Sequence, residues 1–277
     1  MSALAHPDPG RAARARDLVL DSLALAGRNL QHVRQIPEKL LDVTIQPLMF
    51  VLLFAYVFGG VIHVSGGSYR EYLIGGVLIQ TIAFGIMGPA TAIATDLKEG
   101  IVDRFRSLPM ARSAYILGHL LAEFAAAALG IAVLCLSGLL VGWRIHTDLP
   151  QALAGFALLL LFAFAMLVVG TLLGLLVRSP DAAQGFVFIV VFPMTFIAAT
   201  FVPLGGLPPL LRTIAEYNPV SALAAACRTL FGNPVDTPAN AGWPLEHPVL
   251  SAFLWCVAIL AVATPLMLWR YRARTKG

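Results

Sequence analysis

The residues whose types and spacing could do chemistry lie mainly between Asp96 and Glu123, in the stretch DLKEGIVDRFRSLPMARSAYILGHLLAE. Charged side chains of both signs are dense there, and apolar segments long enough to cross a bilayer lie on either side. A polar insert between two membrane spans needs an aqueous environment or a protein partner. The sequence therefore predicts a docking element for a partner outside the membrane.

The sequence patterns of common enzyme sites are missing from this chain. None of the lysines, Lys39, Lys98 and Lys276, follows a glycine, so the nucleotide-binding pattern GxxxxGK[ST] is absent. HExxH and GxSxG are absent as well, the 6 histidines are scattered, and the 3 cysteines share no CxxC spacing. We expect no catalytic residue, no cofactor and no metal on this chain, so that any energy must come from another protein.

The composition is that of a membrane protein. Hydrophobic residues make up 58% of the 277 residues and charged residues 12%, against about 25% charged in ordinary soluble domains. Many uncharged runs reach the roughly 17 to 25 residues that a helix needs to span hydrocarbon. The predicted fold class is an all-α membrane protein with six transmembrane helices. The predicted spans cover residues 41–62, 72–94, 114–140, 152–177, 182–202 and 249–269.

Small and aromatic residues indicate how these spans are packed and placed. Gly170 and Gly174 form a GxxxG arrangement, which is typical of a close helix crossing. We expect Gly75, Gly76 and the other glycines of the second span to be packing sites or kinks. Trp143, in the short loop after the third span, is expected to be an interfacial anchor.

Residues 1–40 form the predicted cytoplasmic N-terminus and contain 6 basic residues. From Arg14 onward, apolar residues recur at helical spacing, which predicts an amphipathic helix in the membrane interface. An ordinary cytosolic helix packed on a partner is the alternative. The next apolar run exceeds the roughly 7 to 15 residues of a signal-peptide core, so we expect no cleaved signal. Residues 41–270 are the predicted transmembrane domain, and residues 271–277 a cytoplasmic tail.

Between Pro203 and Pro248 the sequence changes character. A short helical stripe is broken at Asn218 and Pro219, and a second short helix is expected before a proline-rich segment. Neither helix is long enough to cross the bilayer, yet both are too apolar for a solvated loop. We expect an external re-entrant helical hairpin that dips into the membrane face, with one compact external subdomain as the alternative.

The basic residues are unevenly divided between the two sides of the predicted bundle. With six spans, both termini and the insert after Asp96 share one side, which holds 15 of the 19 Lys and Arg residues. The other side holds 4, namely Arg70, Arg144, Arg212 and Arg228. By the positive-inside rule, both termini and the insert are predicted to be cytoplasmic.

The insert itself has the pattern of a short helix followed by a hinge. One face of the predicted helix carries four apolar residues, Leu97, Ile101, Phe105 and Leu108. Acidic residues lie toward its start and arginines toward its end, as the helix dipole prefers. The prediction is a cytoplasmic helix from Asp96 to Leu108, joined to the third span through a hinge at residues 109–113. An apolar stripe that only rests on lipid is the alternative.

These residues carry a resemblance to a known family. The string from Asp96 to Glu123 resembles the cytoplasmic signature of bacterial type-two ABC exporter permeases, in particular the daunorubicin-resistance group of drug exporters. Further matches are IQPLMFVLLFAYVFGG at residues 45–60 and NPVSALAAACRTLFGN at residues 218–233. The resemblance covers nearly all of the chain after Arg14. It departs from the family pattern at His119, where arginine is usual.

The resemblance implies a permease subunit in the bacterial cytoplasmic membrane, working as two copies or as a pair of related subunits. It implies a separate ABC ATPase subunit, which holds ATP and Mg and onto which the insert docks as a coupling helix. The residues that match the docking motif are Asp96, Glu99, Gly100, Asp103, Arg104, Arg106, Ser107, Pro109 and Arg112. The apolar stripe adds Ile101, Phe105 and Leu108 to this docking surface.

The implied function is export of a small hydrophobic or amphiphilic compound of drug or antibiotic type. The expected partners are therefore the ATPase, a second permease, the lipid bilayer and this substrate, with no role for nucleic acid. A lipid or glycan exporter of the same architecture is an alternative within the family. Outside it, the alternatives are a secondary proton-coupled transporter and a membrane enzyme.

His119 and Glu123 lie one turn apart on the same face of the third predicted span. A charged side chain at a helix centre costs roughly 2.5 to 3.5 kcal/mol on insertion scales, so Glu123 needs a contact with His119 or access to solvent. We expect the pair to brace the docking helix against this span. A protonatable coupling site at Glu123 is one alternative, and a catalytic pair in a membrane enzyme is another.

Overall fold

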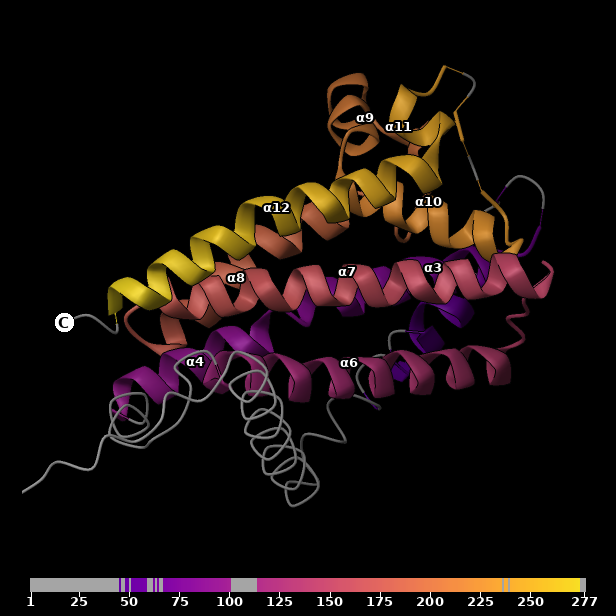
Figure 1. Ribbon diagram of the computed structural model, residues 1–277. Coiled ribbons are helices and arrows are strands. Elements are labelled where there is room, and N and C mark those ends of the chain that lie inside the picture. The colour runs from indigo at the N-terminus through magenta and orange to yellow at the C-terminus, as the bar shows by residue number, and fades with distance from the viewer. Residues whose placement is uncertain are drawn as a thin grey trace, which may run out of the picture.

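The computed structural model is a bundle of long helices (Figure 1). It describes residues 45, 48–49, 51–58, 62, 64, 67–100, 114–235, 237–238 and 240–274. Throughout these ranges every regular element is a helix and there is no strand, so the predicted all-α fold class is confirmed. The long helices are α3 (Tyr69–Phe84), α4 (Met87–Lys98), α6 (Ala114–Val141), α7 (Leu149–Leu176), α8 (Pro180–Phe196) and α12 (Pro248–Arg274).

Helix α7 is the central element of the bundle. It packs against α4, α6 and α12 and against the shorter helix α10 (Pro219–Phe231), and Figure 1 shows it running between α12 on one side and α6 on the other. Leu159, Phe162 and Val168 are each 1% exposed. Because neighbours surround this helix, its residues are apolar on nearly every face.

Four helical stretches in the described part of the chain are long and apolar enough to cross a membrane. They are Tyr69–Lys98, Ile116–Val141, Leu149–Leu176 and Pro248–Arg274, and they correspond to the second, third, fourth and sixth predicted spans. The first predicted span falls partly outside the described residues, although residues 51–58 are helical and Phe54–Phe58 form the π-helix η1. The count of six spans therefore stays a prediction.

The span from Tyr69 to Lys98 is broken near its middle. Helix α3 ends at Phe84 and α4 begins at Met87, with a turn at Gly85 and Ile86. Pro89 explains the break, because it has no N–H to donate to the Gly85 carbonyl four residues earlier and its ring crowds that carbonyl. The second predicted span is therefore two helices in sequence.

Gly170 and Gly174 of α7 form a close crossing with α4. A Cβ atom on Gly170 would overlap the carbonyl oxygen of Ile86, and one on Gly174 would lie 2.7 Å from the carbonyl oxygen of Ala90. Only hydrogen fits between the two backbones at these points. The crossing predicted from the GxxxG spacing is confirmed.

Helix α8 is shorter than the span predicted for it. The prediction covered residues 182–202, but the helix ends at Phe196 and the chain continues to Pro203 as turns and bends. The side-chain nitrogen of Asn218 donates to the carbonyl oxygens of Met194, at 2.7 Å, and Ile197, at 3.3 Å. These contacts satisfy carbonyls at the end of α8 that have no helical partner.

The region after α8 contains the predicted helix, break and helix. Element η2 (Leu204–Gly206) and helix α9 (Pro209–Glu216) precede α10, and α11 (Trp243–Glu246) follows it. The Asn218 side chain accepts a hydrogen bond of 2.9 Å from the Val220 N–H, which caps α10, and Pro219 occupies the first turn. Helix α10 packs on α3, α7 and α12, while α9 and α11 lie at the flank of the bundle (Figure 1). The break at Asn218 is confirmed, and the re-entrant position in a membrane stays a prediction.

Candidate functional site

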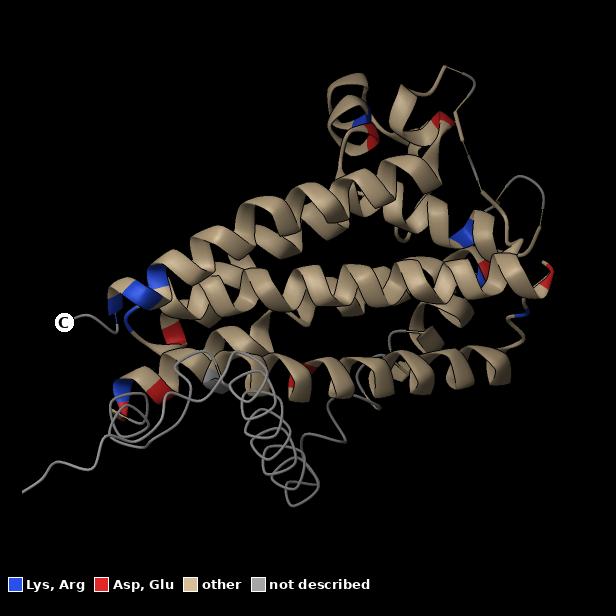
Figure 2. Ribbon diagram, viewed as in Figure 1, with Lys and Arg blue, Asp and Glu red and all other residues tan. Residues whose placement is uncertain are grey.

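Charged residues lie mainly near the ends of the long helices (Figure 2). The C-terminal ends of α4, α7 and α12 lie at one end of the bundle, and the start of α3 and the end of α6 lie at the other (Figure 1). Lys98 ends α4, Arg178 follows α7, and Arg272 and Arg274 are in the last turn of α12. The described basic residues predicted to be cytoplasmic therefore share one end of the bundle.

Helix α4 brings the first predicted docking residues to this end. Asp96 is partly buried in the last turns, and Glu99 is exposed at the C-cap. Gly100 has a φ of 69°, a left-handed conformation that glycine adopts without steric cost. Because α4 ends at Lys98 and the backbone turns at Gly100, the prediction of one continuous helix from Asp96 to Leu108 is wrong at its start. Asp96 and Leu97 belong to α4.

The other predicted docking residues lie outside the described residues. They are Ile101, Asp103, Arg104, Phe105, Arg106, Ser107, Leu108, Pro109 and Arg112. The structure describes the two helices that this stretch connects, α4 before it and α6 after it. The docking role of the stretch therefore remains a prediction.

The two predicted brace residues both lie on α6. His119 is 6% exposed, and Glu123 is partly buried. The Glu123 carboxylate lies against the start of α4, since a Cβ atom on Gly88 would be 3.0 Å from its Oε2 atom. Glu123 thus contacts α4 close to the break in the span, and its bracing role stays a prediction.

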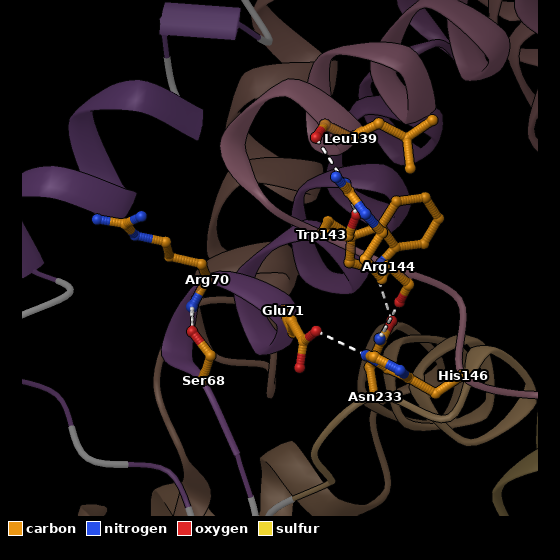
Figure 3. Close-up of polar contacts among 8 residues, drawn as sticks. All are labelled: Ser68, Arg70, Glu71, Leu139, Trp143, Arg144, His146 and Asn233. Atoms are coloured by element: carbon orange, nitrogen blue, oxygen red, sulfur yellow. Dashed lines mark hydrogen bonds and ion pairs between the residues drawn. The ribbon is translucent and has the colours of Figure 1, made fainter.

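A cluster of polar contacts holds the opposite end together (Figure 3). The indole Nε1 of Trp143 donates a 2.6 Å hydrogen bond to Asn233 Oδ1, and Asn233 Nδ2 donates one of 2.8 Å to the Arg144 carbonyl. The Trp143 ring packs edge-on against Phe231, with 5.5 Å between ring centroids. Trp143 is 1% exposed, so the prediction of an interfacial anchor is wrong. Its indole N–H finds an acceptor inside the protein instead of at a membrane surface.

The same cluster reaches the start of α3. His146 Nε2 lies 2.7 Å from Glu71 Oε1, with the His146 side chain 50% exposed and the Glu71 side chain 18% exposed. The backbone N–H of His146 donates to the Phe231 carbonyl at 2.9 Å. Figure 3 shows Glu71 and His146 pointing toward each other, beside the Asn233 contacts. The loop between α6 and α7 is therefore attached to both α3 and α10.

The sequence pattern did not single out Arg228 as a functional residue. It was counted among the charges of the external side, and it is 1% exposed within α10. A signal was available, because Arg228 is the only charged residue between Glu216 and Asp236 and follows an alanine-rich apolar run. A lone charge in such a run indicates a buried position with a specific set of partners.

The geometry defines the class of the protein. Membrane-length apolar helices, charges at the helix ends and a close glycine crossing make this chain a multi-pass α-helical membrane protein. Among the described side chains, no group of three or more His, Cys, Asp or Glu could hold a metal ion. The model of the ABC-2 type transporter family matches residues 22–231. The chain belongs to this family of transporter permeases.

The relatives carry the names of drug-resistance permeases. The daunorubicin resistance ABC transporter permease protein DrrB1 of Streptomyces coeruleorubidus is 29% identical over 204 residues, which is 74% of this chain and 72% of that protein. The doxorubicin resistance permease protein DrrB of Mycobacterium tuberculosis is 26% identical over 233 residues, 81% of this chain and 80% of its own. The probable permease protein DrrC of the same organism is 24% identical over 274 residues, 96% and 94% of the two chains. The resemblance to the daunorubicin-resistance group is confirmed.

Proposed function

We propose that this chain is the permease subunit of an ATP-driven exporter that moves a hydrophobic or amphiphilic compound of drug or antibiotic type out across the bacterial cytoplasmic membrane. The observation that carries the proposal is the family match over residues 22–231 in a chain without a nucleotide-binding pattern. ATP and Mg then belong to a separate ABC ATPase subunit. The names of the relatives support a drug-like amphiphile as the substrate. A lipid or a glycan is the alternative cargo for the same architecture.

The distribution of charge supports an orientation for the bundle. Lys98, Arg178, Arg272 and Arg274 share the end at which α4, α7 and α12 finish. Basic residues near the ends of membrane helices favour the cytoplasmic side. We therefore propose that this end is cytoplasmic, and that both termini are cytoplasmic, as the predicted count of six spans implies. The polar cluster around Asn233 then faces the external side.

The same end is the site where the ATPase would dock. Helix α4 leads into residues 101–113 and α6 leads out of them, so a partner bound to this stretch would act on both helices at once. Glu123 of α6 lies against Gly88 of α4, and Gly170 of α7 lies against the start of α4. A shift of α4 would therefore be passed to α6 and α7 through these contacts, of which the backbone crossing at Gly170 is the closest. This arrangement supports the roles proposed for the docking residues and for Glu123.

Helix α8 supports the proposal of a second permease subunit. Only one stripe of this helix is buried, formed by Ala183, Val187, Val191 and Thr195. Its other faces carry exposed aromatic side chains, among them Phe186, Phe188 and Phe192. Such a surface suits lipid, a second copy or a related subunit, and a hydrophobic substrate moving between two subunits would meet it.

Co-purification tests the docking proposal. The permease is expressed with an ABC ATPase from the same genome and purified through a tag on the permease. Reversing two of the proposed docking arginines, in the variant Arg104→Glu with Arg106→Glu, should reduce the recovered ATPase roughly tenfold or more, because like charges then oppose the partner surface. The matched control is Arg272→Glu with Arg274→Glu, which changes the charge at the same end of the bundle but outside residues 96–112. Equal recovery with both double variants would refute the docking site.

A further inference from the structure

The segment from Ile197 to Pro203 is not a regular helix, yet its middle part, from Ala198 to Phe201, is buried. Ala199 is 6% exposed, Thr200 0% and Phe201 3%. Buried backbone of this kind in a membrane protein needs partners for its carbonyl groups, because no helical N–H reaches them. Side chains from two other helices supply those partners.

Arg228 of α10 makes the central contacts with this segment. Its Nη1 atom donates to the Ala199 carbonyl at 2.6 Å and its Nη2 atom to the Thr200 carbonyl at 2.9 Å. Its Nε atom donates to the Tyr72 carbonyl of α3 at 2.8 Å, and the guanidinium lies 3.4 Å from the centre of the Tyr72 ring. One planar fork thus joins three separate parts of the chain, which the single ammonium of a lysine would not reproduce.

Two tyrosines and a serine complete the attachment. The hydroxyl of Tyr72 donates to the Ala199 carbonyl at 3.1 Å, and the hydroxyl of Tyr69 donates to the Phe201 carbonyl at 3.0 Å. The Ala199 N–H donates to the Ser221 hydroxyl at 3.0 Å. The segment is therefore held between α3 and α10 by polar contacts at residues 199–201.

Two glycines of α3 make room for this arrangement. A Cβ atom on Gly75 would lie 2.9 Å from Arg228 Cγ, and one on Gly76 would overlap the carbonyl oxygen of Thr200. The backbone of α3 can approach the segment this closely only because both positions lack a side chain. These two glycines, which the sequence predicts to be packing sites, therefore allow the close contact of α3 with Arg228 and Thr200.

Backbone carbonyl groups surround the buried guanidinium of Arg228. Among the described residues it donates to three carbonyl oxygens and lies over an aromatic ring, and none of these partners is a carboxylate. Two of these carbonyls belong to the segment itself. Burying the guanidinium is therefore favourable only while the segment stays in place, so the segment and α3 are held to one relative position.

We propose that Arg228 is a positioning residue that locks residues 197–203 onto α3, so that the end of α8 follows α3 during transport. This inference rests on the proposed export function and adds to it a polar contact through which motion of the span Tyr69–Lys98 reaches the end of α8, beside the direct packing of α4 on α8. The span continues through α4 toward residues 101–113, at the opposite end of the bundle. Arg228 thus connects that end to the segment that follows α8.

Thiol labelling tests the lock without any need for transport. Thr200→Cys is introduced into the protein in lipid nanodiscs, where the native thiols Cys135, Cys227 and Cys256 are buried and give a low background. Maleimide should modify Cys at position 200 slowly, and roughly tenfold faster when Arg228→Met is added, because the released segment opens more often. Arg228→Lys should fall between the two. The matched control Arg70→Met removes an arginine of α3 that does not touch the segment and should leave the labelling rate unchanged. An equal rate with Arg228→Met would overturn the proposal.

A transport measurement separates positioning from folding. With the ATPase present, Arg228→Met should keep ATPase binding and ATP hydrolysis within about twofold while export falls roughly tenfold or more. Gly76→Ala should give the same pattern, because it displaces the Thr200 carbonyl and leaves the arginine intact. If binding, hydrolysis and export fall together in both variants, Arg228 is only a folding residue and the proposal is wrong. If the unaltered protein exports nothing with ATP, the proposed function is wrong. The labelling result still decides whether Arg228 holds residues 197–203 on α3.

Discussion

Replacing Gly170 of α7 by alanine should destabilise the bundle at the crossing of α4 and α7. The new methyl group would overlap the carbonyl oxygen of Ile86 and lie 2.7 Å from Pro89 Cγ. Neither atom is the end of a flexible side chain, because the carbonyl is backbone and the proline ring is rigid. The two helices must therefore move apart, and the contacts beside the crossing loosen with them.

The size of the effect follows from the cost of overpacking. Forcing an extra methyl into a close-packed contact costs typically about 1 to 3 kcal/mol. For a chain of this size, each kcal/mol lowers the melting temperature by roughly 2 to 4 °C. We expect the melting temperature to fall by about 2 to 12 °C, measured in detergent by tryptophan fluorescence during heating.

Gly185 of α8 provides the matched control. A Cβ atom at Gly185 has no neighbour within 4 Å, so Gly185→Ala should leave the melting temperature unchanged or raise it slightly through the better helix propensity of alanine. Gly170→Ala gains the same helix propensity, so the difference in melting temperature between the two variants reports the effect of the steric clash alone. Equal melting temperatures would refute the geometry described for the crossing.

Two further predictions concern the polar cluster at Trp143 and the acid on α6. Asn233→Ala leaves the buried indole N–H of Trp143 without its acceptor, which should cost about 1 to 3 kcal/mol and lower the melting temperature; an unchanged melt would contradict the role of this contact. Glu123→Gln keeps the shape of the side chain against Gly88, so export should stay within about twofold if Glu123 is a brace. Loss of export with assembly intact would show instead that the carboxylate must titrate.

Local and compositional signals predicted much of this fold. The lengths of the apolar runs indicated the helices from Tyr69 to Lys98 and from Leu149 to Leu176, because a span must match the bilayer thickness. The break at Asn218 and the crossing at Gly170 were predictable too, since a cap and a GxxxG pair depend on residues close together in sequence.

Local sequence patterns could not predict contacts between residues that are far apart in the chain. The end of α8 is set in part by Asn218, whose partners lie 21 and 24 residues earlier in the chain. Trp143 is buried because Asn233, 90 residues away, accepts its N–H. Arg228 was counted only among the charges of the external side, because its partners, the Tyr72 and Ala199 carbonyls, are backbone groups that no side-chain pattern reveals.

In the candidate site, too, local sequence patterns predicted some features and missed those that depend on contacts with other helices. Charge density identified residues 96–112, which lie within the range that the family model matches. The helical spacing of the apolar residues, however, predicted a helix that continues through Gly100. In the structure Gly100 has a φ of 69°, and the backbone turns there. For Glu123 the sequence left a contact with His119 and access to solvent open, and it did not reveal that the carboxylate lies against Gly88 of another helix.

The measurement that tests the central claim most directly is ATP-dependent uptake of a fluorescent anthracycline into inverted membrane vesicles that contain this permease and the ABC ATPase. The account predicts uptake only when ATP and both proteins are present, and its loss when Arg104 and Arg106 are reversed to Glu. Uptake by the permease alone, driven by a proton gradient and insensitive to that reversal, would contradict the account and establish a secondary transporter instead.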